Sequence, residues 1–270
     1  LNLDASSLKS YPGTGNRWHD LTNHNRYCDA SGAFYTSSDS GVFNFDGADD
    51  HLTGRLDYDT TINPNFTVEA WIYGDSWTDT SSYQSIMNRT DGTSANHDFS
   101  CFIQTSSQGN PGRMASWIFN SGGTNIVHDS GAAGENLVLQ TGVWNHCVWV
   151  FVDGVGYTYY LNGGPGYTHN TGTTRRKTTS DPYTIGRWVN GNYAFDGKMS
   201  NIKFYDRALN PKEVWKNYAA VAPRFGITPI PSIITSGLVA HYDAADYRSY
   251  PRSGTVWYDL TGSVVSPLKS

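Results

Sequence analysis

Four aspartates of this chain stand where a metal ion could be held. Asp46, Asp49 and Asp50 lie within five residues, directly after a strand-like segment that ends in Phe-Asp-Gly, and Asp196 stands in a second Phe-Asp-Gly triplet. Carboxylate oxygens that converge from two loops are ligands that suit Ca²⁺. Alternatively, Asp46 and Asp196 cap their own turns through hydrogen bonds to the backbone, and Asp50 is solvated. The sequence leaves both interpretations open.

Aromatic rings beside amide side chains suggest a second kind of site. The apolar face of a sugar stacks on an exposed ring, while its hydroxyl groups bond to Asn and Asp side chains. Two loops supply such residues, and each ring could also belong to the packed interior. The candidate glycan-binding residues are Trp77 and Tyr83 in the first loop, and Trp188, Asn190, Asn192 and Tyr193 in the second.

The carboxylates do not form a recognisable catalytic pattern. Hydrolysis of a glycan generally needs two carboxyl groups about 5 Å apart for retention of configuration, or farther apart for inversion. The chain has only three glutamates, Glu69, Glu135 and Glu213, and none lies in a Glu-x-Asp-x-x-Glu strand. Nucleophile-elbow, zinc-helix and phosphate-loop motifs are also missing from the sequence. A pair of catalytic aspartates stays an alternative, but we expect a protein that is not an enzyme.

The elements that position these residues are predicted to be strands. The composition, with 28 glycines, 18 tyrosines and 9 tryptophans, is typical of strands and turns. Residues 66–72 carry bulky side chains on both faces, which predicts a strand covered on both sides. Residues 144–152 and 157–161 predict two antiparallel strands joined through Asp153-Gly154. We therefore expect an all-β fold.

One further strand and one helix are predicted near residue 205. Ile202 and Phe204 share one face of an extended segment that ends at Tyr205. The stretch Asn210-Pro211-Lys212-Glu213 offers an N-cap, a proline at the first helical position and a glutamate at the third, which predicts a short helix near residues 211–220. We also expect the two strands that end in Phe-Asp-Gly to be neighbours that meet at one rim.

The opening of the chain recurs near its end. With an offset of 239 residues, ten of the nineteen positions of residues 4–22 are identical in residues 243–261. Residues 223–236 contain three prolines, a density that favours an extended connector. The predicted organisation is a domain over residues 1–222, a Pro-rich linker over 223–236, and the start of a second, truncated copy of the same module over 237–270. We expect a piece of a longer tandem array.

Charge and apolar content argue against binding of nucleic acid and against insertion into a membrane. The formal charge is −5 and the longest basic run is Arg175-Arg176-Lys177, so we expect no binding of nucleic acid. No apolar run reaches the length of a membrane span, so we expect no membrane insertion.

The three cysteines, Cys28, Cys101 and Cys147, are odd in number and far apart, which favours buried thiols and assembly in a reducing cytoplasm. One disulfide with one free thiol stays an alternative.

Several stretches resemble the laminin-G-like, concanavalin-A-like jelly-roll domains, in order and spacing, over roughly residues 1–220. The matching pieces are Phe45-Asp-Gly-Ala-Asp-Asp50, Phe66-Thr-Val-Glu-Ala-Trp-Ile72, Trp144-Asn-His146 with Tyr160-Leu-Asn-Gly163, and Ile185-Gly-Arg187 followed by Ala194-Phe-Asp-Gly197. The resemblance implies a jelly-roll β-sandwich of two antiparallel sheets with one short helix. It also implies that calcium at the rim would be a common feature of such a domain.

The repeated opening has a narrower resemblance. The segments Leu1-Asn-Leu-Asp-Ala5, Ser10-Tyr-Pro-Gly-Thr-Gly15 and Trp18-His-Asp-Leu-Thr22 look like modules of large virion proteins of tailed phages, in tail fibres or capsid-surface appendages. This resemblance implies a structural and adhesion module on the virion surface. Its expected partners are other virion proteins, copies of itself in a homo-oligomer, and host-surface glycans.

Two alternatives remain from the sequence. The chain could be a carbohydrate-binding module of a secreted bacterial enzyme or adhesin, located outside the cell or on the bacterial cell surface. It could also be a purely architectural virion domain with no ligand. Further jelly rolls and a particle-anchoring region next to this segment would favour the virion, whereas a catalytic domain would favour the secreted protein.

Overall fold

A computed structural model describes residues 1–56, 62–78, 81–90, 97–120, 122–131, 137–175, 182–229, 237–243, 249, 256–261 and 265–267. The chain divides into two compact units, Leu1–Pro229 and Ile230–Ser270, and each is described by itself.

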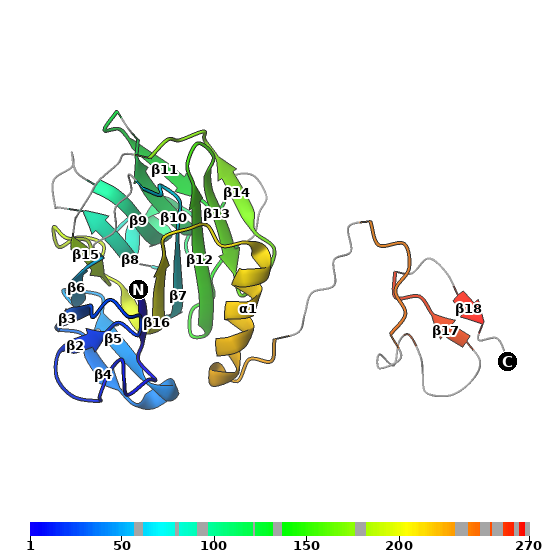
Figure 1. The fold of residues 1–270 in the computed structure, drawn as a ribbon, viewed down its shortest axis with the longest axis horizontal. Helices are drawn as coiled ribbons and strands as arrows, with labels where there is room; N and C mark the ends of the chain where they lie inside the picture. Colours follow the sequence, from blue (N-terminus) through cyan, green and yellow to red (C-terminus); the bar gives the residue numbers. More distant parts are fainter. Residues whose placement is uncertain are drawn as a thin grey trace. The chain divides into compact units, whose positions relative to one another are not determined.

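The first unit is a sandwich of two antiparallel sheets (Figure 1). In sheet A the strand order is β14-β13-β12-β7-β16-β5-β4, and β1 also pairs with β16. The strands of sheet A are β14 Tyr167–Asn170, β13 Gly156–Leu161, β12 Trp144–Val152, β7 Phe66–Gly74, β16 Asp196–Tyr205, β5 Val42–Asp46, β4 Phe34–Thr36 and β1 Asn2–Asp4.

Sheet B faces sheet A across the core, with the strand order β11-β10-β9-β8-β15-β6-β3-β2. Its strands are β11 Asn125–Asp129, β10 Met114–Phe119, β9 His97–Gln104, β8 Tyr83–Thr90, β15 Pro182–Ile185, β6 His51–Arg55, β3 Tyr27–Ser31 and β2 Arg17–His19. Two short 3-10 turns, η1 Ser38–Ser40 and η2 Ser106–Gln108, lie in the connections. The predicted all-β jelly-roll sandwich is confirmed.

Strand β7 shows how the sequence pattern builds the sandwich. Phe66, Val68, Ala70 and Ile72 point into the core between the sheets, because successive side chains of a strand alternate between its faces. Trp71, on the opposite face, is also fully buried. The prediction of a strand covered on both sides is therefore confirmed.

The cover on the outer face of sheet A is helix α1, Pro211–Val221 (Figure 1). Asn210 Oδ1 accepts hydrogen bonds from the backbone N–H groups of Lys212 and Glu213, each at 3.0 Å, and Glu213 Oε2 accepts one from Asn210 N at 2.9 Å. This capping box starts the helix where the sequence predicts it. Val214 and Tyr218 turn their side chains onto the sheet.

The 3-10 helix η3, Ala222–Phe225, continues this cover. The ring of Phe225 stacks on Trp144 with a centroid distance of 4.2 Å, and the guanidinium of Arg224 makes two hydrogen bonds of 2.7 Å to the Asp4 carboxylate. The predicted linker begins at Pro223, whereas the structure folds residues 223–229 into the first unit, because Arg224 and Phe225 have partners there. Residues 230–236 of that predicted linker lie outside the described residues.

The two Phe-Asp-Gly triplets do meet at one rim. Asp46 is the last residue of β5 and pairs with Asp196, the first residue of β16. The second triplet therefore starts its strand and does not end it, because antiparallel neighbours meet with opposite ends. The predicted neighbours are confirmed, and the position of the second triplet along its strand is corrected.

The second unit repeats local structure from the start of the chain. Its described strands, β17 Val256–Tyr258 and β18 Val265–Pro267, pair as β2 pairs with β3. Hydrogen bonds recur at the same offset of 239 residues: Asp4 N donates to Ser10 Oγ at 3.1 Å, and Asp243 N donates to Ser249 Oγ at 3.0 Å. The carboxylate of Asp259 likewise accepts from His241 N at 2.8 Å, as Asp20 accepts from Asn2 N at 2.7 Å.

Two sequence-based expectations concern buried thiols and membranes. All three cysteines are buried and free, as predicted, and burial raises the pKa of the Cys101 and Cys147 thiols well above its ordinary value. Over the residues given above, no helix combines the length and the apolar character of a membrane span.

Candidate functional site

The acidic turn between β5 and β6 is held by its own side chains. Asp46 Oδ1 accepts hydrogen bonds from Ala48 N at 2.9 Å and from Asp49 N at 3.4 Å, and Asp50 Oδ2 accepts one from Asp46 N at 3.0 Å. Gly47 has a φ of +74°, a conformation that glycine adopts without strain. The turn-capping interpretation of Asp46 therefore describes these bonds correctly. The expectation that Asp50 is solvated is wrong, because its side chain is buried and accepts a bond from Asp46 N.

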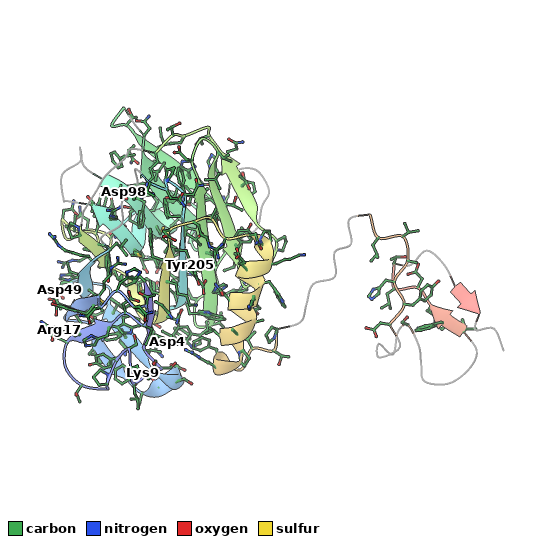
Figure 2. All side chains as sticks on the ribbon, viewed as in Figure 1. Asp4, Lys9, Arg17, Asp49, Asp98 and Tyr205 are labelled. Atoms are coloured by element: carbon green, nitrogen blue, oxygen red, sulfur yellow. The ribbon has the colours of Figure 1, made fainter. Side chains whose placement is uncertain are left out.

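The same turn also brings three carboxylates together. Oxygen atoms of Asp46, Asp49 and Asp50 all lie within 4.8 Å of one another, and Asp49 projects from the periphery of the unit (Figure 2). Burial raises the pKa of Asp50, and the charges of Asp46 and Asp49 add to this effect. Asp196 lies opposite Asp46 in the strand register but does not belong to this cluster of oxygens. Three clustered carboxylates fit the ligand preference of Ca²⁺, so capping and metal binding are compatible here.

The rings expected to be exposed are mostly packed away. Trp77 is only 5% exposed and lies in the main core, where its ring covers Gly74 so closely that a Cβ atom at Gly74 would come within 2.1 Å of it. A ring in this position cannot stack on a sugar. The expectation of an exposed Trp77 is therefore not met, because the lack of a side chain at Gly74 makes room for the indole inside the sandwich.

Tyr83, Trp188 and Tyr193 do come together, on the outer face of sheet B. Trp188 stacks on Tyr193 with a centroid distance of 5.1 Å, and Tyr83 lies 5.6 Å from Tyr193. Phe102 and Trp117 complete this aromatic cluster. Tyr83 and Trp188 are 7% and 8% exposed, while Tyr193 and Trp117 are half-buried. Trp117 was not predicted, although its place between the core residues of β10 could have indicated an outward ring.

The two predicted amides stand on the turn that follows Trp188. Trp188 N donates to Asn192 O at 3.0 Å, and Asn190 Oδ1 accepts from Asn192 N at 3.1 Å. Gly191 and Tyr193 have positive φ values, which tighten the turn. Asn190 and Asn192 are exposed at its tip, so these two amides remain accessible to a ligand.

A continuous row of outward side chains crosses every strand of sheet B. Its central members are buried, whereas those on β2, β3 and β6 are exposed. From β2 to β11, this outer row of sheet B consists of Arg17, Asp29, Thr53, Thr184, Asn88, Ser100, Trp117 and Val127. The described helices α1 and η3 pack on sheet A, so the exposed part of this row has no helical cover.

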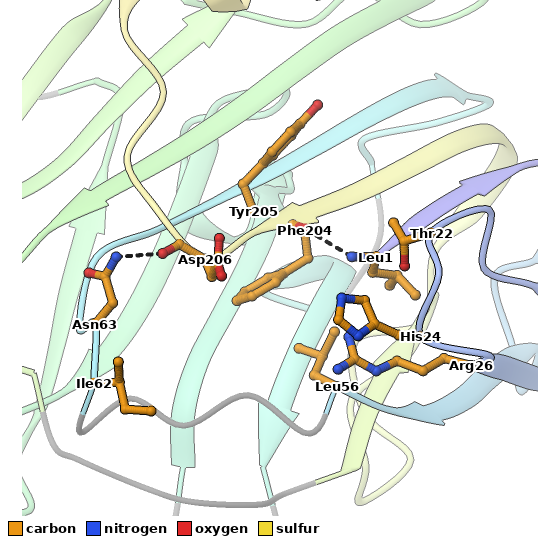
Figure 3. A pocket seen from close by; sticks show the side chains of 10 residues that line it. All are labelled: Leu1, Thr22, His24, Arg26, Leu56, Ile62, Asn63, Phe204, Tyr205 and Asp206. Carbon is orange, nitrogen blue, oxygen red and sulfur yellow. Dashed lines mark hydrogen bonds between the residues drawn. The ribbon is translucent and has the colours of Figure 1, made fainter.

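A cavity of about 430 Å³ opens at one end of the sandwich (Figure 3). On one side, Leu1 N donates a hydrogen bond to Phe204 O at 3.1 Å. His24 and Arg26 line the neighbouring wall, beside Leu56 (Figure 3). No local sequence pattern predicts this cavity, because its walls come from segments far apart along the chain.

The outer face of sheet A holds a different, buried polar cluster beneath α1. Glu69 Oε1 lies 2.6 Å from Lys203 Nζ and 3.3 Å from His146 Nε2, and Glu69 Oε2 accepts a hydrogen bond from Asn217 Nδ2 at 2.6 Å. Burial alone would raise the pKa of Glu69, but the adjacent His146 ring and the Lys203 charge outweigh it and lower the pKa to about 2. This carboxylate is ionised, saturated with partners and closed to a substrate.

A known protein family matches the central part of this chain. The laminin-G family model described as the concanavalin A-like lectin/glucanases superfamily matches residues 46–215. This chain belongs to that superfamily, and the resemblance inferred from its sequence motifs is confirmed. A search of curated protein sequences finds no match.

Solved structures share the fold at low sequence identity. The botulinum neurotoxin serotype G binding domain aligns with a TM-score of 0.58 and 12% identity, over 82% of this chain and 51% of that chain. The binding domain of Paraclostridial Mosquitocidal Protein 1 aligns with a TM-score of 0.59 and 14% identity, over 84% and 54%. Trypanosoma rangeli sialidase in complex with the inhibitor DANA aligns with a TM-score of 0.55 and 13% identity, over 80% and 32%. The chain thus spans about half the length of these toxin binding domains.

Proposed function

We propose that this chain is a non-enzymatic carbohydrate-binding module that serves structure and adhesion on the surface of a tailed-phage virion, in a tail fibre or a capsid-surface appendage. Its ligands are host-surface glycans, and its other partners are virion proteins and further copies of itself. Membership of a lectin superfamily supports the carbohydrate ligand. The repeated opening segment, with its recurring hydrogen bonds, supports a tandem array.

The observation that carries the carbohydrate proposal is the difference between the two outer faces of the sandwich. The outer face of sheet A is covered by α1 and η3, whereas the outer row of sheet B is exposed over β2, β3 and β6. Arg17, Asp29 and Thr53 present there a guanidinium, a carboxylate and a hydroxyl group side by side. Such mixed donors and acceptors are the groups that bind sugar hydroxyls.

The placement of the glutamates supports a binding function over catalysis. Glu69 is buried under α1, and Glu213 closes the capping box and pairs with Arg207 at 2.8 Å. Glu135 lies outside the described residues. Neither described glutamate is therefore placed as an acid or a nucleophile beside an open groove.

Calcium at the acidic turn forms part of the proposal. Asp46, Asp49 and Asp50 would hold the ion through carboxylate oxygens, and Asp196 would approach from the neighbouring strand. The ion would neutralise three clustered negative charges and so stabilise the rim.

A tandem array makes weak sites useful. Modules linked in one chain, or in a homo-oligomer, engage several glycans on one surface, so the avidity exceeds the affinity of any single site. Each site can then bind its sugar weakly.

The full chain on a glycan array, with calcium present, tests the carbohydrate proposal. We expect binding to a defined subset of glycans, and mass spectrometry of purified particles should find the parent chain in a virion. Silence of the folded protein across the array would contradict glycan binding and favour a purely architectural virion domain.

A second candidate function is that of a carbohydrate-binding module in a secreted bacterial enzyme or adhesin. The observation in its favour is that similar structures include toxin binding domains and a sialidase, in which this fold is only part of a longer chain. Finding the parent chain in a culture supernatant, fused to a catalytic domain, would support this candidate against the virion protein.

A further inference from the structure

A second depression, of about 410 Å³, lies on the outer face of sheet B. We call it the Arg26–Arg55 pocket; the residues that matter for its chemistry are His24, Arg26, Tyr27, Asp29, Thr53 and Arg55. Its size falls within the range of about 300–1,000 Å³ that is usual for small-molecule sites. The whole lining belongs to described residues of the first unit.

The strand alternation explains why Tyr27, Asp29, Thr53 and Arg55 gather on one surface. Cys28 and Leu52 are fully buried in the core, so their neighbours along β3 and β6 point outward. The register that pairs Cys28 with Gly54 and Asp29 with Thr53 brings the outward residues of the two strands together. Arg55, at the end of β6, pairs with Pro182 on the other side.

The pocket is lined by two arginines although the chain has a net charge of −5. Arg26 and Arg55 contribute two guanidinium groups to the lining, and Asp29 contributes its carboxylate. That carboxylate already bonds to Arg17 Nε at 3.2 Å, on β2. Arg55 is exposed, and no ion pair or hydrogen bond of its side chain is found within the described part of the chain. A guanidinium in this setting has its donors available for an incoming anion.

An aromatic surface lies beside these charges. Tyr27 is 38% exposed, and the guanidinium of Arg17 lies 4.3 Å from the centroid of its ring. A partly exposed ring offers the apolar face of a sugar a place to stack, and the hydroxyl of Thr53 offers a hydrogen bond. A simple inorganic anion would pair with Arg55 alone, and would gain nothing from the ring.

We propose that the Arg26–Arg55 pocket binds a carboxylate-bearing sugar, a uronic or a sialic acid, at the end of a glycan. Arg55 makes a bidentate, charge-assisted pair with the sugar carboxylate. Arg26 adds positive charge, while Tyr27 and Thr53 contact the ring and hydroxyl groups of the sugar. This inference rests on the proposed carbohydrate-binding function and narrows it to an acidic class of ligand.

The test compares two sugars that differ only in the carboxylate. The full chain is titrated with methyl glucuronide and with methyl glucoside, and binding is followed by saturation-transfer NMR. We expect the glucuronide to bind at least about tenfold more tightly, since a charge-assisted hydrogen bond increases affinity by roughly this factor. Arg55→Gln should remove this preference. The matched control Lys212→Gln, on exposed α1, removes the same charge and should leave the preference intact.

The possible failures can be told apart. Equal binding of both sugars, unaffected by Arg55→Gln, would overturn the acidic-sugar pocket and leave the carbohydrate-binding function standing. Inorganic sulfate that binds as tightly as the glucuronide and competes with it would show a simple anion site, and would also overturn the sugar assignment. If neither these sugars nor any glycan of an array binds, both the pocket and the proposed function fail.

Discussion

The two outer faces of the sandwich use charged side chains in opposite ways. On sheet A, Glu69 and Lys203 are enclosed under α1 and satisfied by one another and by His146 and Asn217. On sheet B, Arg55 is exposed on an uncovered strand. A buried carboxylate that bonds to Lys203 and to Asn217 of α1 fixes the position of the helix, whereas exposed charges on a rigid sheet are available to a ligand. We therefore assign stability to the first face and recognition to the second.

The largest effect should come from breaking the sheet A cluster. Glu69→Ala leaves the Lys203 ammonium without its carboxylate partner under the helix, so we expect a loss of about 3–5 kcal/mol in the free energy of unfolding, measured by urea denaturation. Asp39→Asn, which removes the surface partner of Lys198, should cost less than about 1 kcal/mol. Similar losses in both variants would contradict the assignment of stability to the buried cluster on sheet A.

The second-largest effect should be a loss of folding stability in acid, at the same Glu69 cluster. Since the pKa of folded Glu69 is about 2 and its ordinary value is 4.5, the unfolded chain binds more protons between these pH values. The stability contributed by ionised Glu69 is thus fully present above pH 4.5 and is lost as the pH falls toward 2. Urea unfolding at several pH values should show this loss, and Glu69→Gln should flatten that part of the profile. An unchanged profile in the variant would place the acid sensitivity elsewhere.

Removing the ring of Tyr27 should affect binding more than stability. Tyr27→Ala deletes the stacking surface of the Arg26–Arg55 pocket, so glycan affinity should fall about three- to tenfold. The free energy of unfolding should change by less than about 1 kcal/mol, because the ring is partly exposed. Phe34→Ala removes an exposed ring from the edge of sheet A and should leave glycan affinity unchanged. Equal losses of affinity would show that exposed rings on either face contribute alike.

Calcium should have the smallest effect, a modest rise in thermal stability. An ion at the acidic turn should raise the melting temperature by about 3–6 °C when free calcium is about ten times its dissociation constant. Asp49→Asn should abolish the rise, because Asp49 belongs to the carboxylate cluster but its side chain accepts none of the turn's hydrogen bonds described above. Identical melting curves with calcium and with a chelator would contradict calcium binding at the acidic turn.

The fold could be predicted from local patterns because those patterns report burial. The alternation of Phe66, Val68, Ala70 and Ile72 identified a central strand, and the residues Asn210 to Glu213 carried the capping chemistry of α1. Both signals depend on residues close in sequence. The shared Phe-Asp-Gly triplets predicted a neighbouring pair of strands, but not which end of each strand would be involved.

The candidate site was harder to predict, because it depends on contacts between distant segments. Ring size alone could not place Trp77 in the core, since the space for it is created by Gly74. The Arg26–Arg55 pocket joins the segments around residues 26, 54 and 182, which no local pattern links. The acidic turn was visible in the sequence because its three carboxylates lie within five residues.

Blocking one outer face at a time distinguishes glycan recognition by sheet B from recognition by sheet A. Thr53→Cys places a reactive thiol in the outer row of sheet B, and Lys212→Cys places one on α1 over sheet A. The native thiols are buried, so a bulky maleimide should modify only the introduced cysteine. We predict that the modified Thr53→Cys protein loses binding on the glycan array while the modified Lys212→Cys protein retains it. Retained binding after modification at Thr53→Cys would contradict the assignment of recognition to sheet B.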